Sequence, residues 1–371
     1  MIDRIARFAA NAVRMRAVNG ARLRHQWRDF VTLRQALGTA PSEFYAYRMW
    51  DRDRTPEERV AYLTLADRRK IEGVLNPVPL QKSLLDKLAI TTRLRDAGIP
   101  VPGLVASYHA TTVSKDSPWR SLHGEAGLGA LVKEGWPDGL VIKPNDGGAG
   151  RDVHVFMSVQ DGYFHLVDGR RISPHRLASV LARRRNVLWK IERRVLPHRQ
   201  LNAVVPDVLA TLRVMSFRHR NGTTMIGPSV WKIPQGRSGV DNFARGSLAA
   251  PIDPHSGTIG AGRRSSSDTA TASHPQTGVR FQGMQIPYWS EVDRLVRDAL
   301  DVLPGLHGIG WDVGITDAGP VIIEANPWWG ADVLQVPHGR GLVQGAFADY
   351  LHEFGLGELV QRREATRAGL A

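Results

Sequence analysis

Hydrophobic and polar residues alternate most regularly late in the chain, in the stretch IGWDVGITDAGPVIIEANPWWG at residues 309–330. Residues 309–316 and 320–325 are rich in β-branched and aromatic side chains, which are typical of strands. Between them, residues 317–319 (Asp-Ala-Gly) have the composition of a tight turn. The pattern therefore predicts an antiparallel hairpin.

This hairpin brings polar side chains to one face. With the turn centred on Ala318, Asp312 lies opposite Glu324, and Asn326 shares the face of Glu324 because side chains alternate along a strand. Facing like charges destabilise a sheet, and a divalent cation between them removes the repulsion. The oxygen donors therefore predict a Mg²⁺ site. An exposed hairpin end with two solvated acids is the alternative, which the apolar residues 321–323 make less favourable.

A glycine-rich loop joins two further predicted strands. Residues 140–144 (LVIKP) and 153–156 (VHVF) have strand patterns, and the loop NDGGAG lies between them at residues 145–150. Backbone N–H groups in such a loop can hold phosphate, and Lys143 points in from the first strand. The residue order is not that of a P-loop, and a strand follows where a P-loop requires a helix. An ordinary hairpin turn is the alternative interpretation.

Two apolar strands carry basic residues. Residues 212–217 and 229–233 predict strands that contain Arg213 and Lys232. Burying either cation without an anion is costly, so we expect both to face an anionic group. Surface-facing strand residues are the alternative.

Helical patterns dominate the first 75 residues. Arginines recur over residues 1–36 and predict a helix with a basic face, which is either solvated or in contact with a membrane or nucleic acid. The pair at residues 76–77 (Asn-Pro) ends this helical region. Further helices are predicted over residues 82–96, ending at Gly98, and over residues 288–303.

Composition and charge limit the function classes. The 371 residues include no cysteine, which excludes disulfides, a thiolate nucleophile and cysteine metal sites. The net charge of +13 suits nucleic acid, anionic lipid or phosphate-rich substrates without choosing between them. No apolar run is long enough to span a bilayer, and arginines interrupt the N-terminus where a signal peptide needs an apolar core. We therefore expect a cytoplasmic protein whose basic N-terminal helix could contact a membrane.

Taken together, the order of the motifs resembles that of the ATP-grasp superfamily of ATP-dependent ligases. A lysine-bearing helix ends in GIPVP, and VIKP, the glycine-rich loop, an ExxV segment, two basic strands and D…ExN follow. The chain is most similar to the sugar-transfer-associated ATP-grasp proteins, which are linked to polysaccharide and cell-surface polymer biosynthesis. Four motifs carry this closer resemblance, namely DNF, HPQTG, IPYW and GWDVGI at residues 241–243, 274–278, 286–289 and 310–315.

The resemblance implies how the nucleotide is bound. Lys87, in LDKL, and Lys143, in VIKP, would contact the phosphates of ATP. Gly147, Gly148 and Gly150 would form a flexible loop that closes over them.

The adenine side matches the family less completely. Glu192 and Val195, in ERRV, would lie at the adenine hinge. Many ATP-grasp enzymes place an acid several residues later to bind ribose, whereas this chain has PHRQ at residues 197–200. Either His198 or Gln200 takes that role, or the ribose is held differently.

The catalytic and metal residues come from the strands described above. The resemblance implies that Asp312, Glu324 and Asn326 hold Mg²⁺, for which Mn²⁺ could substitute. Arg213 and Lys232 would face the γ-phosphate and the negative charge that develops during the reaction.

The implied fold is α+β of the ATP-grasp type, with two α+β lobes that clasp ATP after a helical N-terminal region. We expect the helical region at residues 1–75, a first lobe with the glycine-rich lid at 76–190, and a second lobe with the metal site at 191–358. A peripheral tail would follow at residues 359–371.

The implied function is an ATP- and Mg²⁺-dependent ligase that joins a carboxylate to an amine through an acyl phosphate. Its substrates would be small-molecule or saccharide carboxylates and amines, with Asp241, Asn242 and Arg340 on the acceptor side. Phosphoryl transfer to a sugar hydroxyl by the same site is one alternative. A basic binding module with a degenerate nucleotide site is another. We expect no nucleic-acid partner, and the oligomeric state is left open.

Overall fold

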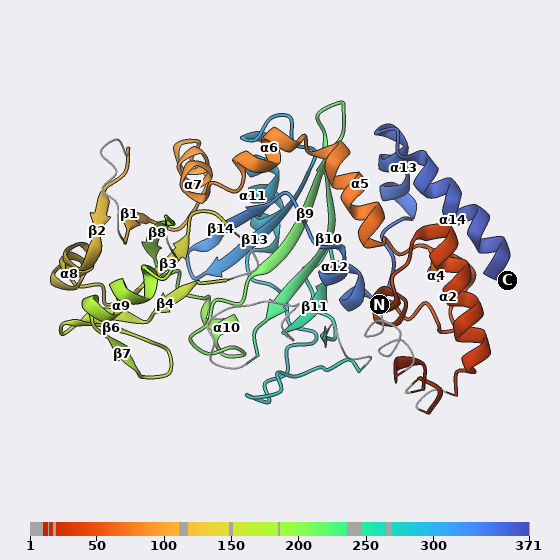
Figure 1. The fold of residues 1–371 in the computed structure, drawn as a ribbon, viewed down its shortest axis with the longest axis horizontal. Helices are drawn as coiled ribbons and strands as arrows, with labels where there is room; N and C mark the ends of the chain where they lie inside the picture. The colour runs from red at the N-terminus through yellow and green to blue at the C-terminus, as the bar shows by residue number, and fades with distance from the viewer. Residues whose placement is uncertain are drawn as a thin grey trace.

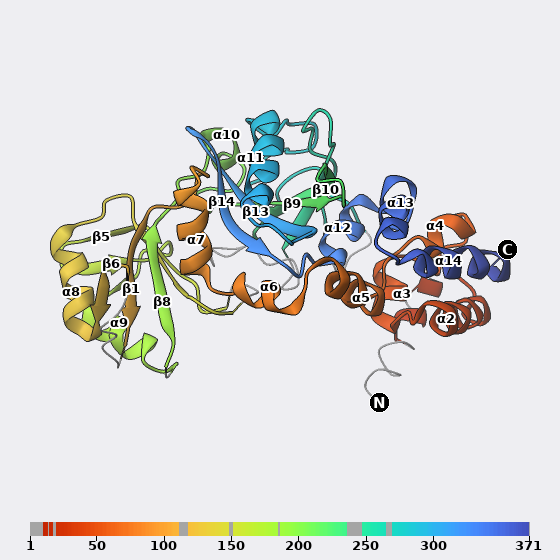
Figure 2. The ribbon, with the colours of Figure 1, turned by 90° about the horizontal axis from the view of Figure 1, so that it is seen from above.

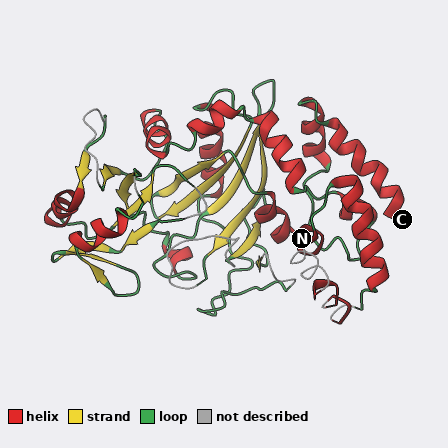
Figure 3. Ribbon diagram, in the orientation of Figure 1, coloured by secondary structure: helices red, strands yellow, loops and turns green. Residues whose placement is uncertain are grey.

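A six-stranded sheet occupies the centre of the computed structural model, with two smaller sheets on one side and a helical layer on the other (Figure 1, Figure 2). The C-terminus of the chain lies in this helical layer, whose helices are drawn in red in Figure 3. This arrangement confirms the predicted α+β architecture with a helical N-terminal region. The structure describes residues 10–13, 15–17, 20–110, 118–147, 151–184, 186–235, 247–264 and 269–370.

The central sheet is antiparallel and has the strand order β12-β11-β10-β9-β13-β14. Its strands are β9 (Leu212–Arg218), β10 (Thr224–Ile233), β11 (Leu248–Ile252), β12 (Arg263–Arg264), β13 (Gly308–Thr316) and β14 (Gly319–Asn326). Alternation along the strands gives the sheet two different faces. Leu212 and Val214 belong to the core beneath α11 (Trp289–Asp301), whereas Met215 and Phe217 belong to the core of the helical layer.

The five-stranded sheet has the order β2-β1-β8-β3-β4, and a three-stranded sheet lies beside it. The strands of the five-stranded sheet are β1 (Leu104–His109), β2 (Ser121–His123), β3 (Leu140–Pro144), β4 (His154–Phe156) and β8 (Leu188–Arg193). The three-stranded sheet contains β5 (Ser158–Gln160), β6 (Tyr163–His165) and β7 (Arg171–Ile172). Helices α8 (Gly124–Glu134) and α9 (Pro174–Leu181) pack into one hydrophobic core with these two sheets. The lobe boundary expected after residue 190 falls inside β8, which pairs with both β1 and β3 and therefore belongs wholly to this sheet.

The helix predicted over residues 82–96 is two helices, α6 (Val78–Ser83) and α7 (Lys87–Asp96). Asp86 separates them because its side chain caps α7 by accepting a hydrogen bond from the Ala89 backbone N–H at 3.0 Å. The first lobe expected at residues 76–190 includes this segment, yet Leu84, Ile90 and Leu94 belong to the core of the central sheet. A short helix, α10 (Arg199–Asn202), follows β8.

The helical layer combines the two ends of the described chain. It contains α2 (Leu23–Leu37), α3 (Pro41–Ala46), α4 (Pro56–Val60), α5 (Leu65–Leu75), α12 (Ala331–His338), α13 (Gly345–Glu353) and α14 (Gly357–Leu370). The helix predicted over residues 1–36 is not continuous within its described part, because Gly20 has a positive φ and α2 begins only at Leu23. No helix among the described residues is both long and apolar enough to cross a membrane.

The C-terminal tail is not peripheral, contrary to the expectation from sequence. Helix α14 packs against α2 and α4, and Leu359 is completely buried. Arg363 donates hydrogen bonds to Asp67 Oδ2 at 2.5 Å and to the Tyr62 carbonyl oxygen at 2.8 Å. The many charged residues of α14 suggested an exposed helix. Sequence could not indicate that Arg363 is buried, because its partner Asp67 lies far away along the chain.

The hairpin of β13 and β14 pairs Asp312 with Glu324, as predicted, but for a different reason. Its turn contains two residues, since Thr316 pairs with Gly319, and that register alone would place Ile323 opposite Asp312. A β-bulge at Ile323 shifts the pairing by one residue and returns Glu324 to the position opposite Asp312. The predicted turn centre was wrong, and the bulge compensates for the error.

Candidate active site

Four charged side chains form a row across one face of the central sheet. Arg213 on β9 pairs with Asp312 on β13, which in turn pairs with Glu324 on β14. Lys232 on β10 lies two residues beyond Val230, the partner of Arg213, and therefore points to the same face. The strand order thus sets two cations beside two carboxylates.

Asp312 neutralises both cations. Its carboxylate accepts hydrogen bonds from Arg213 Nε at 2.9 Å and Nη2 at 3.3 Å, and it lies 3.1 Å from Lys232 Nζ. Burial opposes the ionisation of Asp312, but the two cations outweigh burial and hold its pKa below the ordinary value. Arg213 and Lys232 were expected to face an anionic group, and in the structure the Asp312 carboxylate is such a group.

Glu324 connects the central sheet to α7 and to the start of the glycine-rich loop. Lys87, the first residue of α7, has its Nζ 3.4 Å from Glu324 Oε1 and donates a hydrogen bond to the Gly147 carbonyl oxygen at 2.5 Å. Asn145 holds the loop against the helix, because its Oδ1 accepts a hydrogen bond from the Leu88 backbone N–H at 2.8 Å. Lys87, Gly147 and Glu324 are therefore brought together from three separate parts of the sequence.

A buried cluster of two lysines and one glutamate lies in the five-stranded sheet. Lys143 on β3 pairs with Lys190 on β8, and Glu192 lies two residues beyond Lys190 on the same face. Glu192 Oε1 is 2.6 Å from Lys143 Nζ, and its Oε2 is 2.5 Å from Lys190 Nζ. Lys190 also donates a hydrogen bond to Thr91 Oγ1 at 2.7 Å.

The two lysines of this cluster differ in their ionisation. Burial disfavours the charge of Lys143, but Glu192 and Glu324 outweigh burial and raise its pKa above the ordinary value. Burial prevails at Lys190 and lowers its pKa to about 8, although Glu192 acts in the opposite direction. Lys143 of the five-stranded sheet and Glu324 of the central sheet line the same cavity.

A cavity of about 280 Å³ opens between these elements. Its lining residues are Lys87, Lys143, Pro144, Asp146, Gly147, Arg151, Asp152, Val153, Arg184 and Glu324. Cations from α7, from β3 and from the segments around β4 and α9 therefore face one space with a carboxylate of β14. This composition suits phosphate groups, which several cationic donors can neutralise together.

The predicted metal ligands fit a magnesium ion in type and position. Asp312 and Glu324 face each other, and Asn326 shares the face of Glu324. The Asn326 side-chain amide has a buried nitrogen without a hydrogen-bond partner in the described structure, and rotation of the amide by half a turn would put its oxygen there. No group of three or more histidine, aspartate or glutamate side chains among the described residues could hold a metal ion. Two carboxylates and one amide agree with the sparse protein ligation of Mg²⁺, which is completed by water and phosphate.

Several predicted residues do not line this cavity. His198 caps α10 by accepting a hydrogen bond from the Gln200 backbone N–H at 3.1 Å, and its ring lies near Asp317 in the hairpin turn, at the end of the hairpin opposite Asn326. Val195 follows β8 and is partly exposed. Arg340 lines a different cavity of about 430 Å³ beside Met215 and Phe217. Gly148, Gly150, Asp241 and Asn242 lie outside the described residues.

Sequence reasoning missed Lys190, Arg151 and Arg184. A signal for Lys190 was present in the segment LWKIE, where a lysine within an apolar strand precedes Glu192 by two residues. Arg151 directly follows the glycine-rich loop, which is itself a reason to expect a phosphate contact. Arg184 belongs to a run of three arginines that reads as a solvated surface, and only the fold brings it to the cavity.

Comparison with known proteins gives one family match. The family model described as "Sugar-transfer associated ATP-grasp" matches residues 67–348, which is well over half of the chain. No curated protein sequence matches this chain.

The solved structures that match this chain are similar to it only at low identity and low TM-score. A carboxyaminoimidazole ribonucleotide synthase from Aspergillus clavatus is 13% identical with a TM-score of 0.40, and the match covers 70% of this chain and 50% of that one. A D-alanine–D-alanine ligase from Bacillus anthracis is 14% identical with a TM-score of 0.38, covering 78% and 70%. A biotin carboxylase from Campylobacter jejuni is 12% identical with a TM-score of 0.41, covering 79% and 48%. This chain spans about half the length of the first and third of these proteins.

Proposed function

Because the chain belongs to the sugar-transfer-associated ATP-grasp family, we propose that it is an ATP-dependent ligase that joins a carboxylate to an amine. The observation that carries the proposal is the convergence of Lys87, Lys143 and Glu324 on one cavity, beside the row of charges that contains Asp312. Cations that can hold a triphosphate and oxygen donors that can hold Mg²⁺ are the two requirements of this chemistry.

The proposed reaction has two steps. A carboxylate oxygen of the first substrate attacks the γ-phosphorus of ATP, the bond to the β-phosphate oxygen breaks, and ADP leaves. The amine nitrogen then attacks the acyl carbon, a C–N bond forms, and the C–O bond to phosphate breaks while the nitrogen gives up a proton. The products are an amide, ADP and inorganic phosphate. The protein supplies positioning and charge neutralisation, so no cysteine or other protein nucleophile is required.

The basic residues divide the neutralisation between them. Lys87 and Lys143 hold the phosphates, and Glu192 keeps Lys143 in place before the nucleotide arrives. Arg213 and Lys232 stabilise the charge that develops on the transferred phosphoryl group. Removing one such donor typically lowers the rate about 100- to 1,000-fold, which we expect for Lys143→Ala.

Asp312, Glu324 and Asn326 would hold Mg²⁺, or Mn²⁺ in its place, and the ion would neutralise part of the phosphate charge. Since Asp312 also holds Arg213 and Lys232, it sets the distance between the metal ligands and the cations that face the phosphate.

We propose a saccharide or another small molecule as carboxylate or amine, because the family description names sugar transfer. The proposed pathway is the biosynthesis of a polysaccharide or cell-surface polymer. We propose a cytoplasmic location, where ATP is available, and the basic N-terminal segment as a contact with a membrane surface. Asp241, Asn242 and Arg340 remain the proposed acceptor residues.

A nucleotide titration tests the centre of the proposal. We expect wild type to bind ATP more tightly with Mg²⁺ than without it, and Glu324→Ala to lose this difference. Glu364→Ala, which removes an exposed glutamate on α14, is the matched control and should bind as wild type does. Unchanged Mg²⁺-dependent binding by a folded Glu324→Ala protein would show that Glu324 is no metal ligand.

Product analysis then separates the reaction classes. With a panel of carboxylates and amines, a ligase releases phosphate and forms an amide, whereas a phosphotransferase gives a phosphorylated sugar. Salt-sensitive binding to polyanions without ATP turnover would instead indicate a basic binding module.

A further inference from the structure

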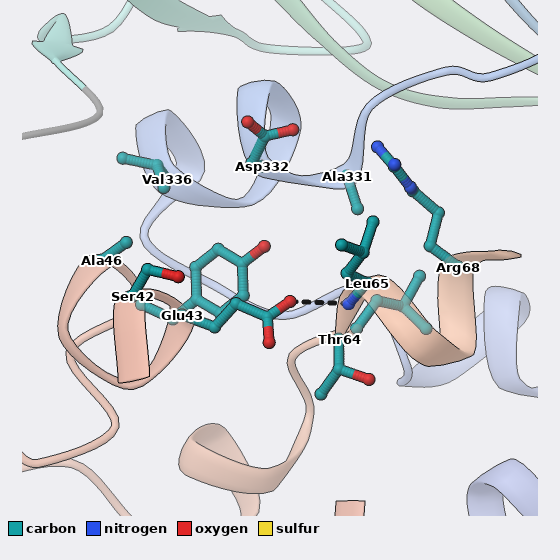
Figure 4. Close-up of a pocket in the computed structure, with 11 residues that line it drawn as sticks. Ser42, Glu43, Ala46, Thr64, Leu65, Arg68, Ala331, Asp332 and Val336 are labelled. Atoms are coloured by element: carbon teal, nitrogen blue, oxygen red, sulfur yellow. Dashed lines mark hydrogen bonds between the residues drawn. The ribbon is translucent and has the colours of Figure 1, made fainter. Parts of the chain in front are cut away.

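A second cavity lies within the helical layer, where the start of α12 faces α3 and α5 (Figure 4). Its volume of about 360 Å³ falls within the range of small-molecule sites. It shares no lining residue with the cavity around Lys143, so it is a separate site. Charged residues Glu43, Arg68 and Asp332 border it, together with apolar side chains that include Leu65 and Val336.

Arg68 brings unused hydrogen-bond donors to this cavity. Its side chain extends from α5 toward Ala331 at the start of α12 (Figure 4). Its buried Nε has no hydrogen-bond partner, and its guanidinium donates no hydrogen bond to any residue that the structure describes. Glu72 Oε1 lies 3.6 Å from Nε, which is too far for a hydrogen bond, and burial raises the pKa of Glu72 to about 7. Glu72 therefore neutralises Arg68 only in part.

The two carboxylates differ in what they already bind. Glu43 accepts backbone hydrogen bonds from Leu65 at 2.6 Å, drawn in Figure 4, and from Ala40 at 2.7 Å, so both of its oxygens are engaged. Asp332 is exposed at the start of α12 and forms no ion pair or hydrogen bond with the described residues. A cation that is only partly neutralised and a carboxylate without a partner among the described residues therefore border the same space.

These charges act on a common point inside the cavity. Burial raises the pKa of the Tyr47 hydroxyl, Asp332 and Glu43 raise it further, and Arg68 lowers it. Arg68 and Asp332 line the same cavity as this hydroxyl, and Leu65 and Val336 offer apolar contacts there for the hydrocarbon part of a small ligand.

We propose that this cavity binds a small zwitterion, with its carboxylate on Arg68 and its protonated amine on Asp332. The guanidinium fork matches a carboxylate, and an exposed carboxylate is the natural partner of an ammonium group. This site goes beyond the proposed ligase function, because it requires neither ATP nor metal.

Calorimetric titration of the full chain without nucleotide tests the site. The probes are glycine, β-alanine and 4-aminobutanoate, which place the two charges at increasing separation, and acetate and methylamine, which carry one charge each. We expect saturable binding of at least one zwitterion at one site per chain, and weaker binding of both single-charge probes. Arg68→Gln and Asp332→Asn should each weaken binding about tenfold or more, because each removes a charged hydrogen bond.

Matched controls separate this effect from a general change of surface charge. Arg69→Gln alters the exposed neighbour of Arg68, and Asp349→Asn alters an exposed aspartate on α13. Both should keep the wild-type affinity. The proposal is overturned if folded wild type binds none of the three zwitterions, or if Arg68→Gln and Asp332→Asn bind as tightly as the controls. The ATP titration is independent, so either proposal can fail alone.

Discussion

Replacing Asp312 with asparagine tests the row of charges across the central sheet. The carboxylate is 10% exposed and holds Arg213, which is 12% exposed, and Lys232, which is 7% exposed. Asparagine has nearly the same shape but no charge. The substitution therefore removes the buried carboxylate that both cations contact.

The expected loss of stability is large. Removing one partner of a buried ion pair costs about 3–5 kcal/mol, against a total stability of about 5–15 kcal/mol for a typical protein. We therefore expect the free energy of unfolding to fall by about 3–5 kcal/mol. An added anion should return part of this loss, since a ligand at a hundred times its dissociation constant stabilises the folded state by about 2.7 kcal/mol.

Urea unfolding followed by tryptophan fluorescence measures both effects, with and without inorganic pyrophosphate and in the absence of Mg²⁺. We expect pyrophosphate to stabilise Asp312→Asn more than wild type, because its negative charge can replace that of the carboxylate which Arg213 and Lys232 contact. Asp317→Asn is the control in the same hairpin, where the aspartate is 55% exposed and its loss should cost less than about 1 kcal/mol. A loss below about 1 kcal/mol in Asp312→Asn, or no added response to pyrophosphate, would refute the reasoning.

Three further predictions concern buried charges elsewhere. Burial lowers the pKa of Lys190 to about 8. Between pH 8 and the ordinary value of 10.5 the unfolded chain therefore keeps a proton that the folded state has lost, so folding becomes more favourable as the pH rises. Urea unfolding should show that wild type gains stability relative to Lys190→Met across that range. Burial lowers the pKa of His338 from 6.5 to about 4, so wild type should lose stability relative to His338→Gln as the pH falls through this window in acid unfolding experiments. Arg363→Met should lower the free energy of unfolding in urea by about 3–5 kcal/mol, because it leaves Asp67 buried with less compensation, whereas the exposed control Arg367→Met should cost less than about 1 kcal/mol.

Each of these three predictions would be contradicted by a specific result. A pH-independent difference between wild type and Lys190→Met, or between wild type and His338→Gln, would mean that burial does not shift that group. Equal stability of Arg363→Met and Arg367→Met would mean that α14 contributes as little as a peripheral tail.

Local patterns predicted β3, β4, β9, β10, β13 and β14, together with the polar residues of the candidate site that these strands carry. Asp312 and Glu324 could be assigned to adjacent strands of one hairpin from sequence, and their oxygen chemistry is readable from residue type, but their direct pairing depends on a bulge at Ile323 that was not predicted. Lys143 and the glycine-rich loop were also recognisable from residue type.

Long-range partners could not be read in this way. Nothing near Arg363 in sequence indicates Asp67, and nothing near β8 shows that this strand inserts between β1 and β3. The partnership of Lys190 with Lys143 follows from that insertion. Similarly, the contribution of α7 to the core of the central sheet depends on packing between segments far apart in the chain.

The bulge at Ile323 lets the hairpin pair the two carboxylates although β14 has one extra residue between them and the turn. Deleting Ile323 would make Glu324 follow Ile322, the partner of Val313, directly, so Glu324 would lie opposite Asp312 in the regular register. A single-codon deletion here should therefore keep the paired carboxylates and remove only the extra twist of the bulge. Among related sequences, a one-residue alignment gap between the aspartate and the glutamate would mark a hairpin without the bulge, and not a lineage that has lost the paired carboxylates.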